Sequence, residues 1–231
     1  MQGEKKQDAL CVKGLNLVLD RKHILKDIHF RVKSGEFVAI VGEIGAGKTS
    51  LLQSLLKVYK ATYDAYEVEG ENAETLGLSI LRSKFSYVPQ ELFVINSTLR
   101  DNISLEYDTD PKYDKAILNS LYVSQFSLKQ ENMNFSLDTE IGERGVNLSG
   151  GQKQRVTLAR CHFADRNIVL LDDCLSAVDV TTEEKLTESL LCGAWKNKTR
   201  ILATHRLSIL SHCDRVFIMK NGEIVENDEI H

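Results

Sequence analysis

Long apolar runs are missing from this sequence. No stretch approaches the roughly 18 consecutive apolar residues that would predict a membrane-spanning helix. The N-terminal segment lacks the apolar core of a secretory signal. Lysine and arginine are scattered and the formal net charge is −4, which argues against a nucleic-acid-binding protein. These absences indicate a domain of a cytosol-like compartment.

Cysteines are few and show no C-x-x-C pairing, and neither a repeat nor a low-complexity tract occurs. An odd number of cysteines in a cytosol-like compartment predicts reduced, mostly buried thiols and disfavours a structural zinc site. The chain has 231 residues, of which 42% are hydrophobic, enough for one large domain or two small ones. The five cysteines are Cys11, Cys161, Cys174, Cys192 and Cys213.

Short apolar runs of strand length alternate with longer stretches of helical spacing, which predicts an α/β sheet with a parallel core. The opening segment alternates apolar and polar residues up to about Val32, so we expect an antiparallel β flank there. Asn221-Gly222 predicts the turn of a terminal hairpin. The predicted strands are residues 24–32, 37–41, 85–88, 168–171, 200–203 and 215–219.

The middle of the chain differs, because residues 91–165 show helical spacing and loops without a convincing strand. Helices are expected at residues 112–122 and 152–163. We therefore predict a helical subdomain at 91–165, inserted into a core that residues 1–90 and 166–231 form.

One segment fits the phosphate-loop pattern G-x-x-x-x-G-K-[ST], between a predicted strand and a helical stretch. Its glycines let backbone N–H groups face inward, and the helix N-terminus adds partial positive charge. Lys48 is expected to reach the β- and γ-phosphates of ATP, and Thr49 to bind Mg²⁺. The alternative is a glycine-rich turn with an incidental lysine, which the strand and helix disfavour. The predicted phosphate-binding residues are Gly42, Glu43, Ile44, Gly45, Ala46, Gly47, Lys48, Thr49 and Ser50.

Two carboxylates, Asp172 and Asp173, follow the apolar run 168–171. The C-terminal end of a buried parallel strand is where ligands of α/β sheets bind. We expect Asp172 to be the second anchor for Mg²⁺, and Asp173 to orient or deprotonate the attacking water. The alternative is a strand end with two solvated acids.

A second anion site is predicted at the start of the helix near residue 152, where a serine hydroxyl and glycine N–H groups precede the helix. A helix cap is the alternative, since serine is a favoured N-cap, but a cap does not require two glycines. One ATP does not need both anion sites, whereas two chains arranged head to tail would use both. The segment is Leu148-Ser149-Gly150-Gly151-Gln152, and with it the sequence resembles the nucleotide-binding domain of ABC transporters over nearly its whole length.

The resemblance implies that this signature segment closes over the γ-phosphate held by the phosphate loop of a partner cassette. Gln90 in Tyr87-Val88-Pro89-Gln90 resembles the Q-loop glutamine, which touches Mg²⁺. Asp179 ends a segment, residues 176–179, that is similar to the D-loop, which crosses the dimer interface. His205 resembles the switch histidine that contacts the γ-phosphate.

Two further segments, Ser97–Ile103 and Thr139–Gly145, are similar to exporter sequences, the second to the part that contacts the transmembrane domain. The signature and its flanks most resemble the multidrug-resistance-associated (C-type) subfamily. The resemblance implies ATP and Mg²⁺ as cofactors, and a second cassette and a transmembrane domain as partners. It also implies a location at the cytoplasmic face of a membrane.

The sequence departs from the family pattern at two positions. Asp173 stands where active cassettes usually have glutamate, as in the first cassette of C-type transporters, so we expect weak hydrolysis at this chain's own site. Leu19 aligns with the aromatic residue that stacks on adenine, so an apolar contact would replace stacking, with His23 as a possible substitute.

Two other functions stay open. The chain could hold ATP as structural glue while its partner hydrolyses, which Asp173 favours. It could also be a non-transport ABC ATPase of the chromosome-maintenance or DNA-repair type. Those proteins place a long coiled coil between phosphate loop and signature, whereas only about a hundred residues without sustained heptads intervene here.

Overall fold

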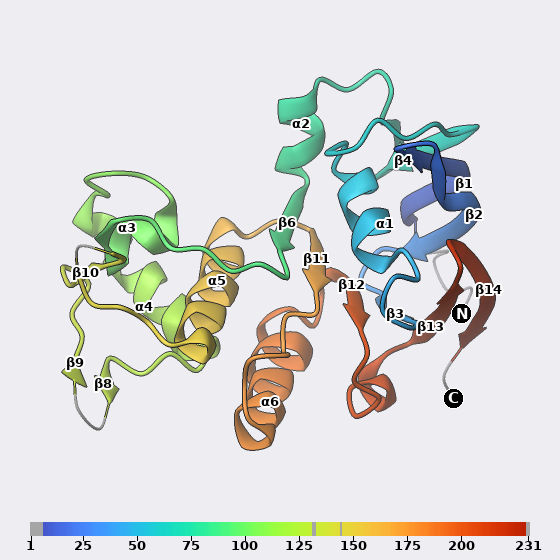
Figure 1. Cartoon of the computed structure of the whole chain (residues 1–231). Coiled ribbons are helices and arrows are strands. Elements are labelled where there is room, and N and C mark those ends of the chain that lie inside the picture. Colours follow the sequence, from blue (N-terminus) through green and yellow to red (C-terminus); the bar gives the residue numbers. More distant parts are fainter. Residues whose placement is uncertain (1–6, 131–132, 144, 230–231) are drawn as a thin grey trace, which may run out of the picture. The chain divides into compact units, whose positions relative to one another are not determined.

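The computed structural model describes residues 7–130, 133–143 and 145–229 (Figure 1). The chain forms two compact units. The first takes the described residues up to Tyr87, Arg166–Asp173 and those from Asn197 onward; the second takes Val88–Asp165 and Cys174–Lys196. None of the helices in the described ranges combines the length and hydrophobicity needed to cross a bilayer.

The main sheet of the first unit has six strands in the order β14-β13-β3-β12-β11-β6. Neighbours among β13, β3, β12 and β11 are parallel, while β14 returns antiparallel after a two-residue turn. Strands β11 and β12 are buried along their whole length, which explains the unbroken apolar runs 168–171 and 201–203 within them. The strands are β3 (Phe37–Val41), β6 (Phe85–Val88), β11 (Ile168–Asp172), β12 (Thr199–Thr204), β13 (Arg215–Lys220) and β14 (Glu223–Glu229).

An antiparallel flank completes the first unit, as its alternating sequence predicted. Its strand order is β2-β1-β4-β5. One apolar core joins this flank, the main sheet and helix α1 (Lys48–Leu55), and includes Leu25, Leu51 and Phe217. The remaining elements of the unit are β1 (Asp8–Leu19), β2 (Lys22–Lys33), β4 (Ala65–Val68), β5 (Glu71–Asn72), α2 (Leu78–Ser83) and η3 (Leu210–His212).

The second unit is mostly helical and has its own apolar core, to which Leu99, Ile117 and Val156 contribute. The expected helices are present, with the 112–122 prediction divided between a 3-10 turn and α4. The fold is therefore the predicted one: an α/β phosphate-loop core with an antiparallel β flank and a helical insertion. The helices are α3 (Leu99–Ser104), η1 (Pro111–Tyr113), α4 (Asp114–Val123), α5 (Gly150–Ala164), α6 (Val180–Leu186) and the π-helix η2 (Thr187–Ala194).

The expectation that residues 91–165 contain no strand is wrong in detail. The described part of this segment contains two antiparallel pairs, β7 with β10 and β8 with β9, each strand two residues long. Strands this short are invisible to a period-two pattern, which needs at least four residues. The bounds are β7 (Ser97–Thr98), β8 (Lys129–Gln130), β9 (Met133–Asn134) and β10 (Glu140–Ile141).

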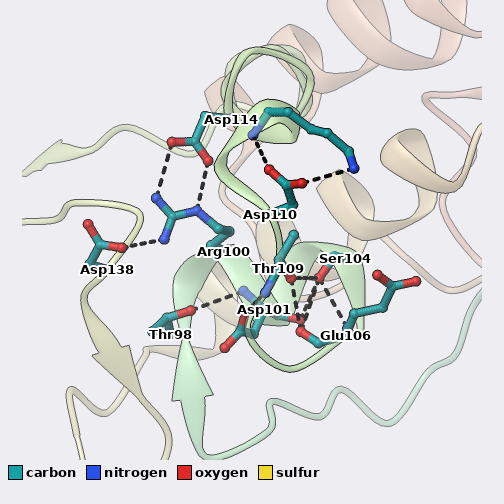
Figure 2. A network of polar contacts seen from close by, with 10 residues as sticks. Thr98, Arg100, Asp101, Ser104, Glu106, Thr109, Asp110, Asp114 and Asp138 are labelled. Atoms are coloured by element: carbon teal, nitrogen blue, oxygen red, sulfur yellow. Dashed lines mark hydrogen bonds and ion pairs between the residues drawn. The ribbon is translucent and has the colours of Figure 1, made fainter.

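The two exporter-like segments pair with each other through β7 and β10. Thr98, Arg100 and Asp101 of the first segment take part in a network of polar contacts within the second unit (Figure 2). Arg100 donates to both carboxylate oxygens of Asp114, at 2.7 and 3.1 Å, and also pairs with Asp138. Asp101 accepts from the Ser97 hydroxyl and the Thr109 backbone. Arg144, in the second segment, lies outside the described residues.

Two segments, residues 88–90 and 174–196, are grouped differently from the predicted division into 1–90, 91–165 and 166–231. Residues 174–196 belong to the second unit, where the Ser189 hydroxyl donates to the Val123 carbonyl and accepts from the Gln125 amide. Where the functional boundaries lie stays a prediction.

Candidate functional site

The phosphate loop connects β3 to α1 within the first unit. Helix α1 begins at Lys48, and its N-cap Gly47 has φ 106°, a left-handed conformation that suits glycine. Among the described residues, no side chain caps this helix. Its first N–H groups are therefore directed at the loop without a competing side-chain acceptor, as an anion site requires.

The turn of the β13–β14 hairpin supports the phosphate loop from behind. The Gly222 N–H donates to the Ala46 carbonyl at 3.0 Å, and the Gly222 carbonyl accepts from the Lys26 N–H at 2.8 Å. A Cβ at Gly42 would lie only 2.3 Å from the Met219 carbonyl oxygen. The glycines of the loop therefore also serve close packing against β13, a role that the motif does not reveal.

Lys48 folds back over its own loop. Its Nζ donates to the Gly42 carbonyl at 2.6 Å and the Glu43 carbonyl at 3.0 Å. Partial burial lowers the pKa of Lys48, and the charges of Asp173 and Asp172 oppose that effect. The ammonium group thus contacts two backbone carbonyl oxygens and lies near the charges of Asp172 and Asp173.

Asp172 ends β11 and is almost fully buried. Its Oδ1 accepts from the Thr49 hydroxyl at 3.0 Å, and its Oδ2 accepts from the Tyr87 hydroxyl at 3.2 Å. Burial raises the pKa of Asp172, and the two hydroxyl donors lower it. Tyr87 is a site residue that the sequence did not reveal, because 85 residues separate it from Asp172 and no motif connects the two.

The pair Thr49 and Asp172 fits Mg²⁺, because both side chains offer oxygen atoms at one point. Magnesium is usually held by one or two carboxylates together with substrate phosphates and water, rather than by a cage of protein ligands. In the described part of the chain, no cluster of three His, Cys, Asp or Glu residues suited to a metal ion occurs. Gln90, the third predicted ligand, is exposed after β6 and belongs to the second unit.

Asp173 and His205 follow neighbouring parallel strands, β11 and β12, and meet beyond their ends. His205 Nδ1 lies 3.1 Å from Asp173 Oδ1. Asp173 has φ 49°, and its N–H donates to the Ala203 carbonyl at 2.9 Å, which fixes the residue at the sheet edge. The structure thus brings together the two predicted catalytic side chains of the first unit.

Leu19, the predicted adenine contact, ends β1 opposite Lys22 and packs partly buried against the core. His23 lies on β2 and is exposed. The role of either side chain toward a base stays a prediction.

The signature segment lies in the second unit and starts α5 with a reciprocal cap. Ser149 Oγ accepts from the Gln152 N–H at 3.2 Å, and Gln152 Oε1 accepts from the Ser149 N–H at 2.8 Å. Leu148 is buried, while Ser149 and Gly150 are exposed. The helix cap weighed in the sequence is therefore present, and the serine hydroxyl still has its proton to donate to an anion.

Asp179 caps α6 in the same unit. Its carboxylate accepts from the Thr182 N–H at 3.0 Å and the Thr182 hydroxyl at 2.7 Å. These bonds lower the pKa of Asp179, so the side chain stays ionised on an exposed surface.

Comparison with known proteins gives consistent matches. The family model described as ABC transporter matches residues 25–176. The chain is 36% identical over 210 residues to ATP-binding cassette sub-family B member 6 of Xenopus tropicalis, covering 90% of this chain and 24% of that protein. It is 39% identical over 204 residues to ABC transporter C family member 9 of Arabidopsis thaliana, covering 87% of this chain and 12% of that protein.

A solved structure, that of a bacterial Atm1-family ABC exporter with ATP bound, matches with a TM-score of 0.84 at 28% identity. The match covers 97% of this chain and 39% of that one. The chain thus spans well under half the length of these relatives. With the phosphate loop, the paired acids and the capped signature helix in place, the chain belongs to the ABC transporter family, as a nucleotide-binding domain of the exporter type.

Proposed function

We propose that this chain binds Mg-ATP on its phosphate loop and pairs with a second cassette that completes the site with its own signature segment. Closure of the pair around two Mg-ATP would power export by a transmembrane domain, at the cytoplasmic face of a membrane. The observation that carries this proposal is the convergence of Lys48, Thr49, Asp172, Asp173 and His205 at one edge of the main sheet.

In this proposal, the loop N–H groups and Lys48 bind the β- and γ-phosphates. Thr49, Asp172 and Gln90 would hold Mg²⁺, which when bound neutralises charge on the phosphate oxygens. Asp173 would orient the attacking water, and His205, already paired with Asp173, would contact the γ-phosphate. ATP binding energy closes the pair, and hydrolysis resets it.

We further propose that hydrolysis at this site is weak. Aspartate is one methylene shorter than glutamate, which withdraws the carboxylate by about 1.5 Å. A displacement of about 1 Å costs on the order of 100-fold in rate. We therefore expect Asp173→Glu to raise the ATPase rate of the chain by about 10–100-fold, with little change in ATP affinity.

The measurement is steady-state ATP hydrolysis together with ATP titration, with Asp173→Asn as the matched control that keeps size and removes the charge. A faster Asp173→Glu variant supports a competent but impaired site. An unchanged rate with normal ATP binding would instead favour the second candidate function, a module that holds ATP while its partner hydrolyses. That candidate rests on Asp173 itself and its fixed position beside His205.

A further inference from the structure

The segment that follows Asp173, residues 174–179, packs on the signature helix α5 of the same chain. The Ala177 N–H donates to Gln154 Oε1 at 3.2 Å, across 23 residues of sequence. Gln154 is 1% exposed, and Leu175 and Val178 of the segment are also buried. A buried side-chain amide that accepts from a loop N–H fixes the loop, because breaking the bond leaves a desolvated polar group unpaired.

The second glycine of the signature takes part in the same contact. A Cβ at Gly151 would lie 3.2 Å from the Ala177 carbonyl oxygen and 4.0 Å from Val178 Cγ1. A Cβ at Gly150 would lie 3.9 Å from Ala177 Cβ. Glycine at position 151 therefore permits a close approach of the loop to α5, a requirement separate from helix capping and from anion binding.

Opposite charges also hold the segment 174–179 to α5. Burial lowers the pKa of Arg155, the residue after Gln154, and the charge of Asp179 raises it. Arg155 on α5 and Asp179 at the end of the segment thus attract each other. A hydrogen bond, a close glycine contact and an attraction between opposite charges all join the same two pieces of chain.

We infer that Gln154 is a positioning residue that holds the segment 174–179 to the signature helix, so that the signature and the D-loop are presented to a second cassette as one rigid piece. The inference rests on the proposed function in one respect, namely that a second cassette contacts both the signature and the D-loop. It assigns Gln154 no contact with nucleotide.

The first test measures the hydrogen bond from the Ala177 N–H to Gln154 directly, as amide hydrogen exchange at Ala177 in the nucleotide-free chain. The wild-type amide should be protected, and Gln154→Met, which keeps the volume and removes the acceptor, should raise its exchange rate at least tenfold. Gln154→Glu keeps an acceptor oxygen and should restore protection. Thr157→Val is the control, because Thr157 is equally buried on α5 but its hydroxyl donates to the Lys153 carbonyl of its own helix.

The second test measures ATP-dependent association by sedimentation. Gln154→Met should weaken association at least tenfold while ATP binding stays at the wild-type level, and Thr157→Val should leave both unchanged. An Ala177 amide that exchanges as fast as in an unstructured peptide in the wild type overturns the inference, even if Gln154→Met does not fold. Unchanged exchange and association in a folded Gln154→Met variant also overturn it. If wild-type chains do not associate with one another when ATP is present, the proposed pairing of cassettes is contradicted instead. The exchange measurement then remains the test of the hydrogen bond between Gln154 and Ala177.

Discussion

Asp172 shows how one buried carboxylate is aimed by two hydroxyl donors. Thr49 and Tyr87 each donate to a different oxygen of this group. Tyr87→Phe removes one donor and leaves the ring packing in place. Because a hydrogen bond to a charged group contributes about 1.5–3 kcal/mol, and Tyr87 is only half buried, we expect metal affinity in the ATP complex to fall about 5–10-fold.

The measurement is a Mn²⁺ titration in the presence of ATP, followed by electron paramagnetic resonance. Tyr63→Phe is the matched control, since Tyr63 is a partly buried tyrosine of the same unit whose ring packs on Tyr66. Equal Mn²⁺ affinity in Tyr87→Phe and wild type would show that Thr49 alone orients the carboxylate.

Residues that lie in a local pattern were the predictable part of the site. The phosphate loop, the acids after β11 and His205 each follow a strand that the adjacent apolar residues predict. Tyr87 and Gln154 were missed because their partners, Asp172 and the Ala177 backbone, are remote in sequence and follow no spacing rule. When the partner is a backbone N–H, as for Gln154, any residue type can supply it, so the sequence contains no sign of the contact.

Helices α3 and α4 are joined to the loop before β10 by one side chain, Arg100 (Figure 2). Hydrogen bonds from Arg100 hold the pKa of Asp114 below its ordinary value. A carboxylate with a lowered folded-state pKa stabilises the fold above its unfolded-state pKa of about 3.9, and this contribution is lost as pH falls through the lowered value.

We therefore expect Arg100→Met to lower the thermal unfolding midpoint by about 2–4 °C at pH 7, and by less and less as pH falls below about 4. Lys112→Met is the control, because Lys112 forms an exposed pair with Asp110 and such pairs contribute little. A difference between wild type and Arg100→Met that persists at about pH 2 would mean that packing of the arginine stem, rather than its ion pairs, stabilises the unit.

The β13–β14 turn acts on the phosphate loop through Gly222, which has φ 83°. A Cβ there would meet the Ile24 carbonyl oxygen at 2.3 Å, so Gly222→Ala must displace the turn and its bond to Ala46. We expect the free energy of unfolding to fall by about 1–3 kcal/mol and ATP affinity to fall with it.

Urea unfolding and ATP titration measure the two effects of Gly222→Ala. Gly77→Ala serves as control, since Gly77 has φ −62° and an added Cβ would meet no heavy atom within 4 Å. Normal ATP affinity in a destabilised Gly222→Ala variant would show that the turn contributes to stability but not to ATP binding by the phosphate loop.

Predictability of elements followed their length and burial. Strands β3 and β6 were predicted to the residue, because a short apolar run between turn residues leaves little choice of where the strand begins and ends. The β7–β10 pair was not predictable, since its two-residue strands are defined only by each other. The grouping of residues 174–196 with the second unit likewise depends on contacts such as that between Ser189 and Val123, which no periodicity encodes.

At the level of the assembled pair, the two anion sites of one chain belong to different units, the phosphate loop to the first and the signature to the second. If each ATP is bound by the loop of one chain and the signature of another, lesions in the two elements should complement each other. Lys48→Met removes the loop lysine, and Ser149→Arg blocks the signature. Each variant alone damages every site of its own dimer.

A mixture of the two variants forms dimers in which one site carries both lesions and the other carries neither. With random pairing, half of the dimers are mixed and one of their two sites is intact, so the mixture should trap about a quarter of the ATP that wild-type dimers trap. Filter binding of labelled ATP at equal total protein measures this recovery. A mixture of Lys48→Met with Lys48→Met,Ser149→Arg is the control without any intact site and should trap none, because no chain in it supplies a working loop. A test mixture that traps no more than this control, while the wild type dimerises with ATP, would mean that the loop and signature of a site come from the same chain.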